Sequence, residues 1–161
     1  MRQPDPSLPE PLARVLDDVA ADGVHIAHVL ASEDGAVPAY AFTVGLWHTF
    51  ERPEVIVFGL DEEVAEQLLE ALADEASDGA SFAPGSRSEG LLHGYPVRFL
   101  DVPKERRGEH VALADWAHEG ADFPLVQVVY PDKQGRWPWD PEAREGFRRH
   151  QPVIGVREPS A

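Results

Sequence analysis

The sequence predicts an α+β fold: a largely antiparallel or mixed sheet of about five or six strands, flanked by about two to four helices. Three strand-like segments, at 25–30, 40–47 and 55–60, follow one another without a helix between them. A doubly wound parallel sheet needs a helix between successive strands, so this run disfavours it. One long helix is then expected at 61–78. Sheets of this size also curl into partly open barrels, and the sequence leaves that alternative open.

The N-terminal region predicts an arm followed by an amphipathic helix. Residues 1–9 contain three prolines and are expected to be frayed or disordered. Pro11 suits the first turn of a helix, where its missing N–H costs no hydrogen bond. Four apolar residues then recur at helical spacing: Leu12, Val15, Leu16 and Val19. Gly23 is expected just past the end of this helix.

The stretch 61–78 predicts a second amphipathic helix, with Asp61 as its N-cap and Gly79 closing it. Its apolar side chains are expected to face the sheet and its acidic ones largely the solvent. The apolar set is Val64, Leu68 and Leu72, and the acidic set is Glu62, Glu63, Glu66, Glu70, Asp74 and Glu75.

The second half of the chain predicts shorter elements. Residues 78–90 are rich in Gly, Ser and Ala and are expected to form a loop. The elements expected after it are strands at 95–100 and 123–130, a helix at 109–118, a helix opening at Asp140-Pro141-Glu142, and an edge strand at Val153-Ile154.

We expect one domain, residues 10–156, between the arm 1–9 and a short tail, 157–161. The 161 residues include no cysteine, which excludes disulfides and thiolate metal sites. The N-terminus lacks the apolar stretch of a signal peptide, and no apolar run approaches the roughly 20 residues of a membrane helix. A soluble, cytoplasmic protein is therefore expected, and its Ala- and Arg-rich composition is typical of a bacterium with a GC-rich genome.

The charge is distributed unevenly. The formal net charge is −15, from 14 basic and 29 acidic residues. Residues 1–86 contain 3 basic residues against 17 acidic ones, whereas residues 87–161 contain 11 against 12. Because an acidic chain repels phosphate backbones, no nucleic acid is expected as a partner, and no membrane is expected either. The possible partners that remain are a small molecule, another protein or a second copy of the chain. Alternatively, the acidic charge only keeps the protein soluble.

Gln127 is the most informative polar residue, because it lies in the middle of a strand that is apolar on both faces. A buried amide without partners costs about 1–3 kcal/mol, so something must satisfy it. Two interpretations are open. Either a neighbouring main-chain group or Thr43 bonds the amide, or the amide faces a ligand cavity.

Gly45, inside a strand, indicates a bulge or a close approach by another group. His48 lies in the loop expected after it. Glu54 opens a buried strand, where a carboxylate can cap exposed N–H groups, pair with an arginine or act as a base if buried. Glu54 and His48 are thus the candidate catalytic residues, and a structural carboxylate and a surface histidine are the alternatives.

Trp137 and Trp139 flank a proline. Such a pair can stack on a flat ligand or cover the edge of a core as a lid.

No metal site is expected. His25 and His28 are three residues apart on a strand and so point to opposite faces. The sequence contains neither HExxH nor a cysteine cluster. A site assembled from distant residues (His48, Glu54 and Asp132) is the one alternative left open.

Over about residues 22–156 the chain resembles the bacterial domain-of-unknown-function 4262 family. The segments that carry the resemblance are Tyr40-x-x-Thr43-Val44-Gly45-Leu46, Pro53-Glu54, Phe58-Gly59-Leu60, Gln127-Val128-Val129-Tyr130-Pro131-Asp132, Gly135-Arg136-Trp137-Pro138-Trp139 and Gln151-Pro152. Many members have a histidine directly before the Pro-Glu pair, where this chain has Arg52. The resemblance implies a small bacterial cytoplasmic protein and no assigned activity.

The leading functional hypothesis is a small-molecule-binding domain. Its pocket is expected between strands 40–46 and 123–130, beneath a tryptophan lid at 137–139, since small-molecule sites are largely apolar with a few aimed polar groups. The expected ligand-binding residues are Tyr40, Thr43, Gln127, Asp132, Trp137, Trp139 and Gln151.

Two other functions stay open. One is an enzyme that uses Glu54 or His48 as acid or base, flavin-dependent by fold analogy with split-barrel flavin reductases. The other is a protein-interaction or immunity-type module that uses the acidic helix 61–78. The sequence itself specifies no cofactor.

Overall fold

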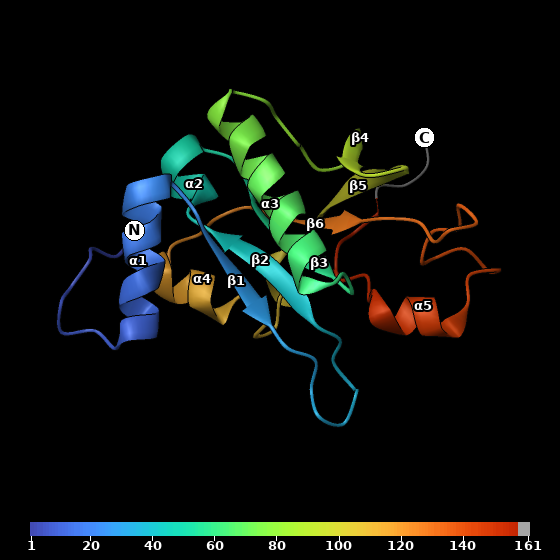
Figure 1. Ribbon diagram of the computed structural model, residues 1–161, viewed down its shortest axis with the longest axis horizontal. Coiled ribbons are helices and arrows are strands. Elements are labelled where there is room, and N and C mark those ends of the chain that lie inside the picture. Colours follow the sequence, from blue (N-terminus) through green and yellow to red (C-terminus); the bar gives the residue numbers. More distant parts are fainter. Residues whose placement is uncertain (158–161) are drawn as a thin grey trace.

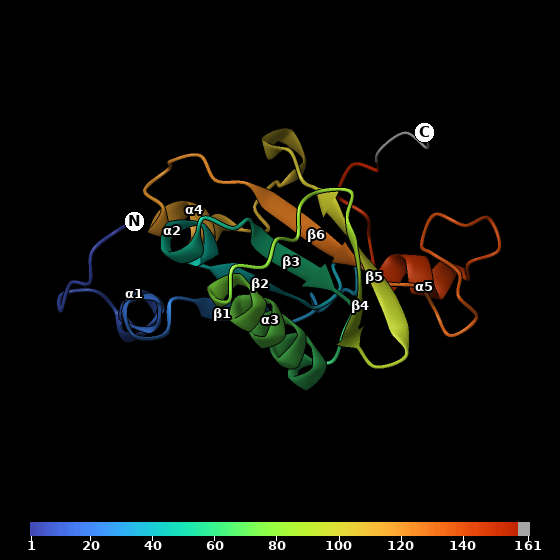
Figure 2. The same ribbon diagram turned by 90° about the horizontal axis from the view of Figure 1, so that it is seen from above.

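A six-stranded mixed sheet forms the centre of the structure, a computed structural model that describes residues 1–157. Its strands are β1 (His25–Val29), β2 (Tyr40–Val44), β3 (Glu54–Phe58), β4 (Arg87–Leu92), β5 (Tyr95–Asp101) and β6 (Leu125–Val129). They lie in the order β1-β2-β3-β6-β5-β4 (Figure 2). Only β3 and β6 pair in parallel, and the other pairs are antiparallel. The predicted α+β class is confirmed. The sheet is open, with β1 and β4 at its edges, so the barrel alternative does not hold.

Five α-helices within residues 1–157 flank the sheet (Figure 1). They are α1 (Glu10–Asp22), α2 (Leu46–Phe50), α3 (Glu62–Ser77), α4 (Ala112–Ala117) and α5 (Glu145–His150), with a short 3₁₀ helix at Lys104–Arg106. The sequence did not predict α2, because Leu46 and Trp47 continue the apolar pattern of β2 and the residues from His48 onward were expected to form a loop. This five-residue helix brings the number of α-helices to five, whereas two to four were expected.

The sheet is covered on both faces. On one face α3 packs over Val55, Val57 and Val126. On the other, α1 and α4 pack over Ile56, Phe58 and other apolar residues. All five residues of β3 and of β6 are buried, which explains why both strands read as apolar on both sides.

Two glycines let the end of α1 meet the end of β2. Gly23 ends α1 in the left-handed conformation, and its N–H bonds the carbonyl of Val19 at 2.9 Å. Gly45 has φ 115°, and a Cβ there would lie 2.9 Å from the carbonyl oxygen of Gly23. Of the two interpretations of Gly45, a bulge or a close approach, the structure shows the close approach, but β2 ends at Val44, so Gly45 lies just past the strand and not inside it. The helix end predicted at Gly23 is confirmed.

The loop predicted at 78–90 is wrong at its end, where β4 begins at Arg87. This edge strand is largely exposed, and its pairing with β5 shifts register between Ser88 and Leu92. A polar, irregular edge strand carries little of the apolar alternation by which strands are recognised.

The C-terminal elements also differ from the prediction. The last helix begins at Glu145, because the carboxylate of Asp140 accepts the N–H of Trp137 at 2.7 Å and does not open a helix. Val153-Ile154 is not a strand. A single bridge joins Val156 to Asp101 in this region.

The N-terminal arm lies against α4. The N–H of Arg2 donates to the carbonyl of Ala117 at 2.7 Å, and its guanidinium lies 4.6 Å from the ring centroid of Trp116. Of the expected tail, residues 158–161 lie outside the described residues. Among residues 1–157, no helix combines the length and hydropathy that crossing a membrane requires.

Candidate functional site

The most distinctive cavity lies at the carboxyl ends of the two parallel strands. Because β3 and β6 run in the same direction, the segments that follow them meet at one edge of the sheet. A cavity of about 430 Å³ opens there. Its lining comes from the segments after β3 and β6, from α3, from the β4–β5 hairpin and from α5. In Figure 1 this edge lies between the start of α3 and α5.

The walls of the cavity are apolar and aromatic. Leu60, Leu92 and Tyr130 are half-buried and continue the core beneath α3. Val64 of α3 leaves 38% of its surface exposed. The ring of Phe147 meets the ring of Tyr130 nearly edge-on, with centroids 6.1 Å apart. The cavity thus exposes apolar side chains to solvent on a concave surface.

Tyr130 is fixed in position by hydrogen bonds. Its hydroxyl donates to the carbonyl of Phe58 at 2.8 Å, and burial raises its pKa well above the ordinary value. The main-chain N–H of Tyr130 donates to Gln151 Oε1 at 3.0 Å, and Gln151 Nε2 donates to the main-chain carbonyl of Tyr130 at 2.9 Å. This wall of the cavity is therefore preformed.

Polar groups stand at the rim of the cavity: His93, Asp132 and Lys133. The Oδ1 atom of Asp132 accepts the N–H groups of Gln134 and Arg136, at 2.9 and 2.8 Å. Asp132 therefore shapes the turn after β6, and its position in the lining puts a carboxylate beside the apolar walls.

Gln127 lies elsewhere, and its amide is bonded to the main chain. Its Nε2 donates to the carbonyl of Pro152 at 2.8 Å, and its Oε1 accepts the N–H groups of Ile154 and Gly155, each at 2.9 Å. The main-chain interpretation of Gln127 is the one that the structure shows. In addition, β3 lies between β2 and β6, so it fills the space where the sequence placed a pocket.

Thr43 and Glu54 belong to a buried network. The hydroxyl of Thr43 donates to Glu54 Oε1 at 2.8 Å and accepts the N–H of Val55 at 2.9 Å. Glu54 also accepts the N–H groups of Gly45 and Leu46, at 2.8 and 3.0 Å, at the start of α2. This carboxylate thus caps N–H groups, one of the three roles expected for it.

The side chain that faces Glu54 across the network is His118, which the sequence did not single out. His118 Nε2 lies 2.8 Å from Glu54 Oε2, and the two side chains are 5% and 1% exposed. The imidazole of His118 also stacks on Phe123, with centroids 4.6 Å apart. His118 is 64 residues from Glu54, so no local pattern could pair them. His48 is exposed on α2 and makes none of these contacts.

The remaining predicted residues lie apart from one another. Tyr40 donates its hydroxyl to the carbonyl of His110 at 2.9 Å. Trp137 and Trp139 stack on each other, with centroids 5.5 Å apart and planes 2° from parallel. Of the predicted ligand-binding residues, Asp132 is in the lining of the cavity and Gln151 supports it through Tyr130.

Most residues of the cavity were missed because they are apolar and look like core residues in the sequence. Leu60, Val64 and Leu92 give no signal that distinguishes a wall from an interior. The segments Phe58-Gly59-Leu60 and Tyr130-Pro131-Asp132, which carry part of the family resemblance, also contribute to this lining.

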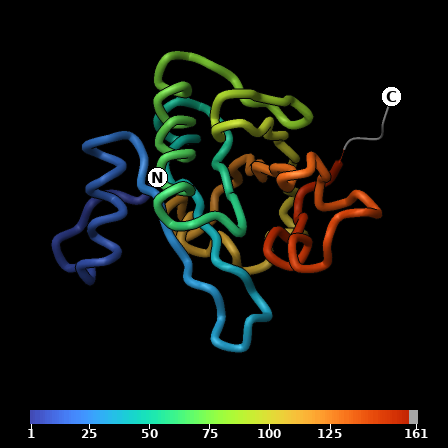
Figure 3. The backbone as a smooth tube through the Cα atoms, turned by 45° about the vertical axis from the view of Figure 1, so that its right-hand side comes forward, coloured from blue at the N-terminus to red at the C-terminus, as the bar shows by residue number. Residues whose placement is uncertain are grey.

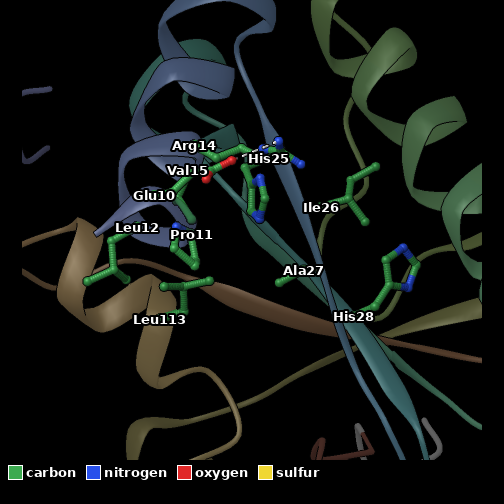
Figure 4. A pocket seen from close by; sticks show the side chains of 10 residues that line it. All are labelled: Glu10, Pro11, Leu12, Arg14, Val15, His25, Ile26, Ala27, His28 and Leu113. Carbon is green, nitrogen blue, oxygen red and sulfur yellow. Dashed lines mark ion pairs between the residues drawn. The ribbon is translucent and has the colours of Figure 1, made fainter. Parts of the chain in front are cut away.

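A second, more open groove of about 600 Å³ runs between α1, β1 and α4. Figure 4 shows Leu12 and Leu113 facing each other across it, while His28 points away toward α3. His25 Nδ1 bonds Asp18 Oδ2 of α1 at 2.8 Å, and His28 pairs with Glu66 of α3. The two histidines thus serve opposite faces of β1. Residues 1–157 contain no group of three or more His, Asp or Glu side chains arranged to hold a metal ion.

Comparison with known proteins identifies a family for the chain. No curated protein and no solved structure shows significant similarity to the chain. The model of the family described as "Domain of unknown function (DUF4262)" matches residues 18–144, well over half of the chain. The match includes β3, β6 and most of the segments that line the cavity. The chain therefore belongs to the DUF4262 family.

Proposed function

We propose that this protein is a small-molecule-binding domain whose site is the cavity at the carboxyl ends of β3 and β6. The observation that carries the proposal is the exposed apolar and aromatic lining of that cavity. Soluble proteins rarely leave concave apolar surface open to water without a use for it. The volume of about 430 Å³ falls in the range of small-molecule sites. In open sheets, ligands commonly bind outside the carboxyl ends of parallel strands.

The lining favours a flat, largely apolar ligand with one polar end. The rings of Tyr95, Tyr130 and Phe147 offer large contact areas to a ring. At the rim, Asp132 and Lys133 offer an acceptor and a donor for a single hydroxyl or amino group. A strongly charged ligand would lose its hydration against mostly apolar walls, so it fits this cavity poorly.

Native mass spectrometry tests this proposal. The purified protein is incubated with a small-molecule extract of bacterial cells and then analysed without denaturation. We expect a bound molecule on the wild type. We expect none on Val64→Trp, because the indole would fill the cavity from α3.

Val37→Trp is the matched control, since Val37 is also 38% exposed but lies outside this cavity. It should retain the molecule as the wild type does. The absence of any adduct, or an adduct that survives Val64→Trp unchanged, would refute the proposed site.

A second candidate function is binding of a basic protein. Acidic side chains border a groove of about 530 Å³ along the free edge of β1: Asp18, Asp22, Glu66, Glu70 and Asp74. An attraction between this groove and a basic partner is screened by salt. A complex isolated at low ionic strength should therefore dissociate when salt is raised, and a complex that persists is held by some other surface.

A further inference from the structure

A cluster of two tryptophans and three arginines lies away from the cavity. We call it the arginine–tryptophan cluster, and its members are Arg87, Arg98, Trp137, Trp139 and Arg157. The guanidinium carbon of Arg98 is 5.7 Å from the ring centroid of Trp137 and 5.4 Å from that of Trp139. Arg87 lies 6.0 Å from Trp137, and Arg157 lies 4.7 Å from Trp139. The neighbours of Arg98 on β5, Val97 and Phe99, face α3, so the cluster occupies the opposite face of the sheet.

The arrangement of the arginines is unfavourable for the protein alone. Arg87 and Arg98 are direct partners across the β4–β5 ladder. Like charges in directly opposite positions repel each other. The indoles offset part of this repulsion, because a guanidinium is attracted to the face of an aromatic ring.

No other group in the described residues neutralises the cluster. Within residues 1–157, none of its three guanidinium groups forms an ion pair with a carboxylate or donates a hydrogen bond. Asp140, which follows Trp139, uses its carboxylate to accept the N–H of Trp137. By contrast, Arg52 and Arg107 donate to main-chain carbonyls, at 2.7 and 3.1 Å. Among residues 1–157, the N–H donors of the cluster thus have no acceptor, in a chain that has an excess of acid.

We infer that the arginine–tryptophan cluster binds the phosphoryl group of a small molecule. A phosphate monoester carries close to two negative charges and three acceptor oxygens, which match several guanidinium forks better than one carboxylate does. The indole faces hold the guanidinium groups in place, so less side-chain freedom is lost on binding. The net charge of −15 opposes the approach of a long polyanion, which favours a small phosphate over a nucleic acid. This site is independent of the apolar cavity.

Isothermal titration calorimetry at low ionic strength, with inorganic phosphate and with adenosine monophosphate, tests the inference. We expect saturable one-to-one binding by the wild type. Arg98→Gln should weaken it at least ~10-fold, because Arg98 contacts both indoles and its charge-assisted bonds are lost. Arg157→Gln should weaken it by a smaller factor. Arg106→Gln removes an exposed arginine outside the cluster and should change the affinity by less than about twofold.

The two probes distinguish the sources of the phosphate. Tighter binding of adenosine monophosphate indicates a phosphorylated ligand whose ring also contacts the protein, and equal binding indicates recognition of the phosphate alone. Both results support the site. No saturable binding, or an affinity unchanged in Arg98→Gln and Arg157→Gln, overturns it. Tighter binding of a single-stranded oligonucleotide than of the mononucleotide overturns the assignment to a small molecule. Arg157 lies beyond the last bridge of the sheet, so its variant keeps the test valid if Arg98→Gln unfolds.

Discussion

At the scale of single residues, Glu54 joins parts of the chain that no local pattern connects. Its carboxylate accepts four hydrogen bonds, from Thr43, Gly45, Leu46 and His118. These donors come from β2, from the start of α2 and from the end of α4. The sequence indicated that Glu54 needed partners, but it did not identify His118, because their pairing depends on the tertiary fold.

Glu54→Gln should lower the free energy of unfolding by about 3 kcal/mol. The amide group would turn an N–H donor toward groups that are themselves donors, and His118 would face that amide in place of a carboxylate. Urea denaturation measures the change. Glu63→Gln, at an exposed position of α3, should change stability by less than about 0.5 kcal/mol. Equal effects of the two substitutions would show that the hydrogen bonds of Glu54 contribute no more to the free energy of unfolding than an exposed glutamate does.

Gly59→Ala should destabilise the protein more than Gly135→Ala does, by about 1–3 kcal/mol. Both glycines have φ 79°, so the backbone strain of a side chain is the same. A Cβ at Gly59 would collide with the main-chain carbonyl of His150 and lie 2.9 Å from the hydroxyl of Tyr130, whereas a Cβ at Gly135 meets nothing within 4 Å. Thermal unfolding of the two variants isolates the cost of contact. Identical melting temperatures would mean that α5 does not press on Gly59.

Stability should fall as the pH falls below the ordinary pKa of histidine, in part because of His110. Burial between Tyr40 and Phe58 lowers the pKa of His110 from its ordinary value of 6.5. The unfolded chain therefore binds a proton at a higher pH than the folded chain. The contribution of His110 to the free energy of unfolding is fully present above pH 6.5, the pKa in the unfolded chain. It is lost as the pH falls from there through the lower pKa of the folded protein.

His110→Phe keeps the aromatic contacts and removes this titration. The loss of unfolding free energy between about pH 7.5 and pH 5.5 should be smaller in this variant than in the wild type. Denaturation curves at the two pH values provide the comparison. An unchanged loss would assign the pH dependence to the other histidines.

At the scale of elements, apolar periodicity predicted the helices that are long and the strands that are fully buried. The apolar run 55–60 predicted the strand that the structure has as β3, and the acidic and apolar faces of 61–78 predicted α3. The same criterion missed α2, whose first two residues, Leu46 and Trp47, extend the pattern of β2, and β4, whose exposed edge is polar. For the segment after α5, the sequence showed that Gln127 needed partners but not that residues 152–155 supply them.

Gln127→Leu should release the segment after α5 without removing a strand. The N–H groups of Ile154 and Gly155 would lose their acceptor, so their amide hydrogens should exchange with solvent at least ~10-fold faster. Hydrogen–deuterium exchange read by NMR measures this. Gln134→Leu, in an exposed turn, is the control and should leave both amides protected. Unchanged protection in Gln127→Leu would contradict the role assigned to this amide.

At the scale of the whole molecule, the candidate sites depend on topology. The single parallel pair, β3 and β6, places the ends of two distant strands at one edge, and α3, the β4–β5 hairpin and α5 complete the cavity. Figure 3 shows the loop 30–39 projecting from the body of the molecule, to which the chain then returns. The end of α5 lies beside the segment before α3, since a Cβ at Gly59 would collide with the carbonyl of His150. Because the site is assembled from segments that are far apart in the sequence, the sequence alone indicates only isolated polar residues of it, such as Asp132.

The central claim is that this cavity accepts a flat apolar molecule, and NMR titration with indole tests it most directly. Indole matches the expected ligand, with one ring system and a single N–H donor. The account predicts saturable shifts of the amide signals of Leu60, Val64, Leu92 and Tyr130, with the groove beside α1 unaffected. Shifts that are absent at these four residues, or that gather instead around Leu12 and Leu113, would contradict it.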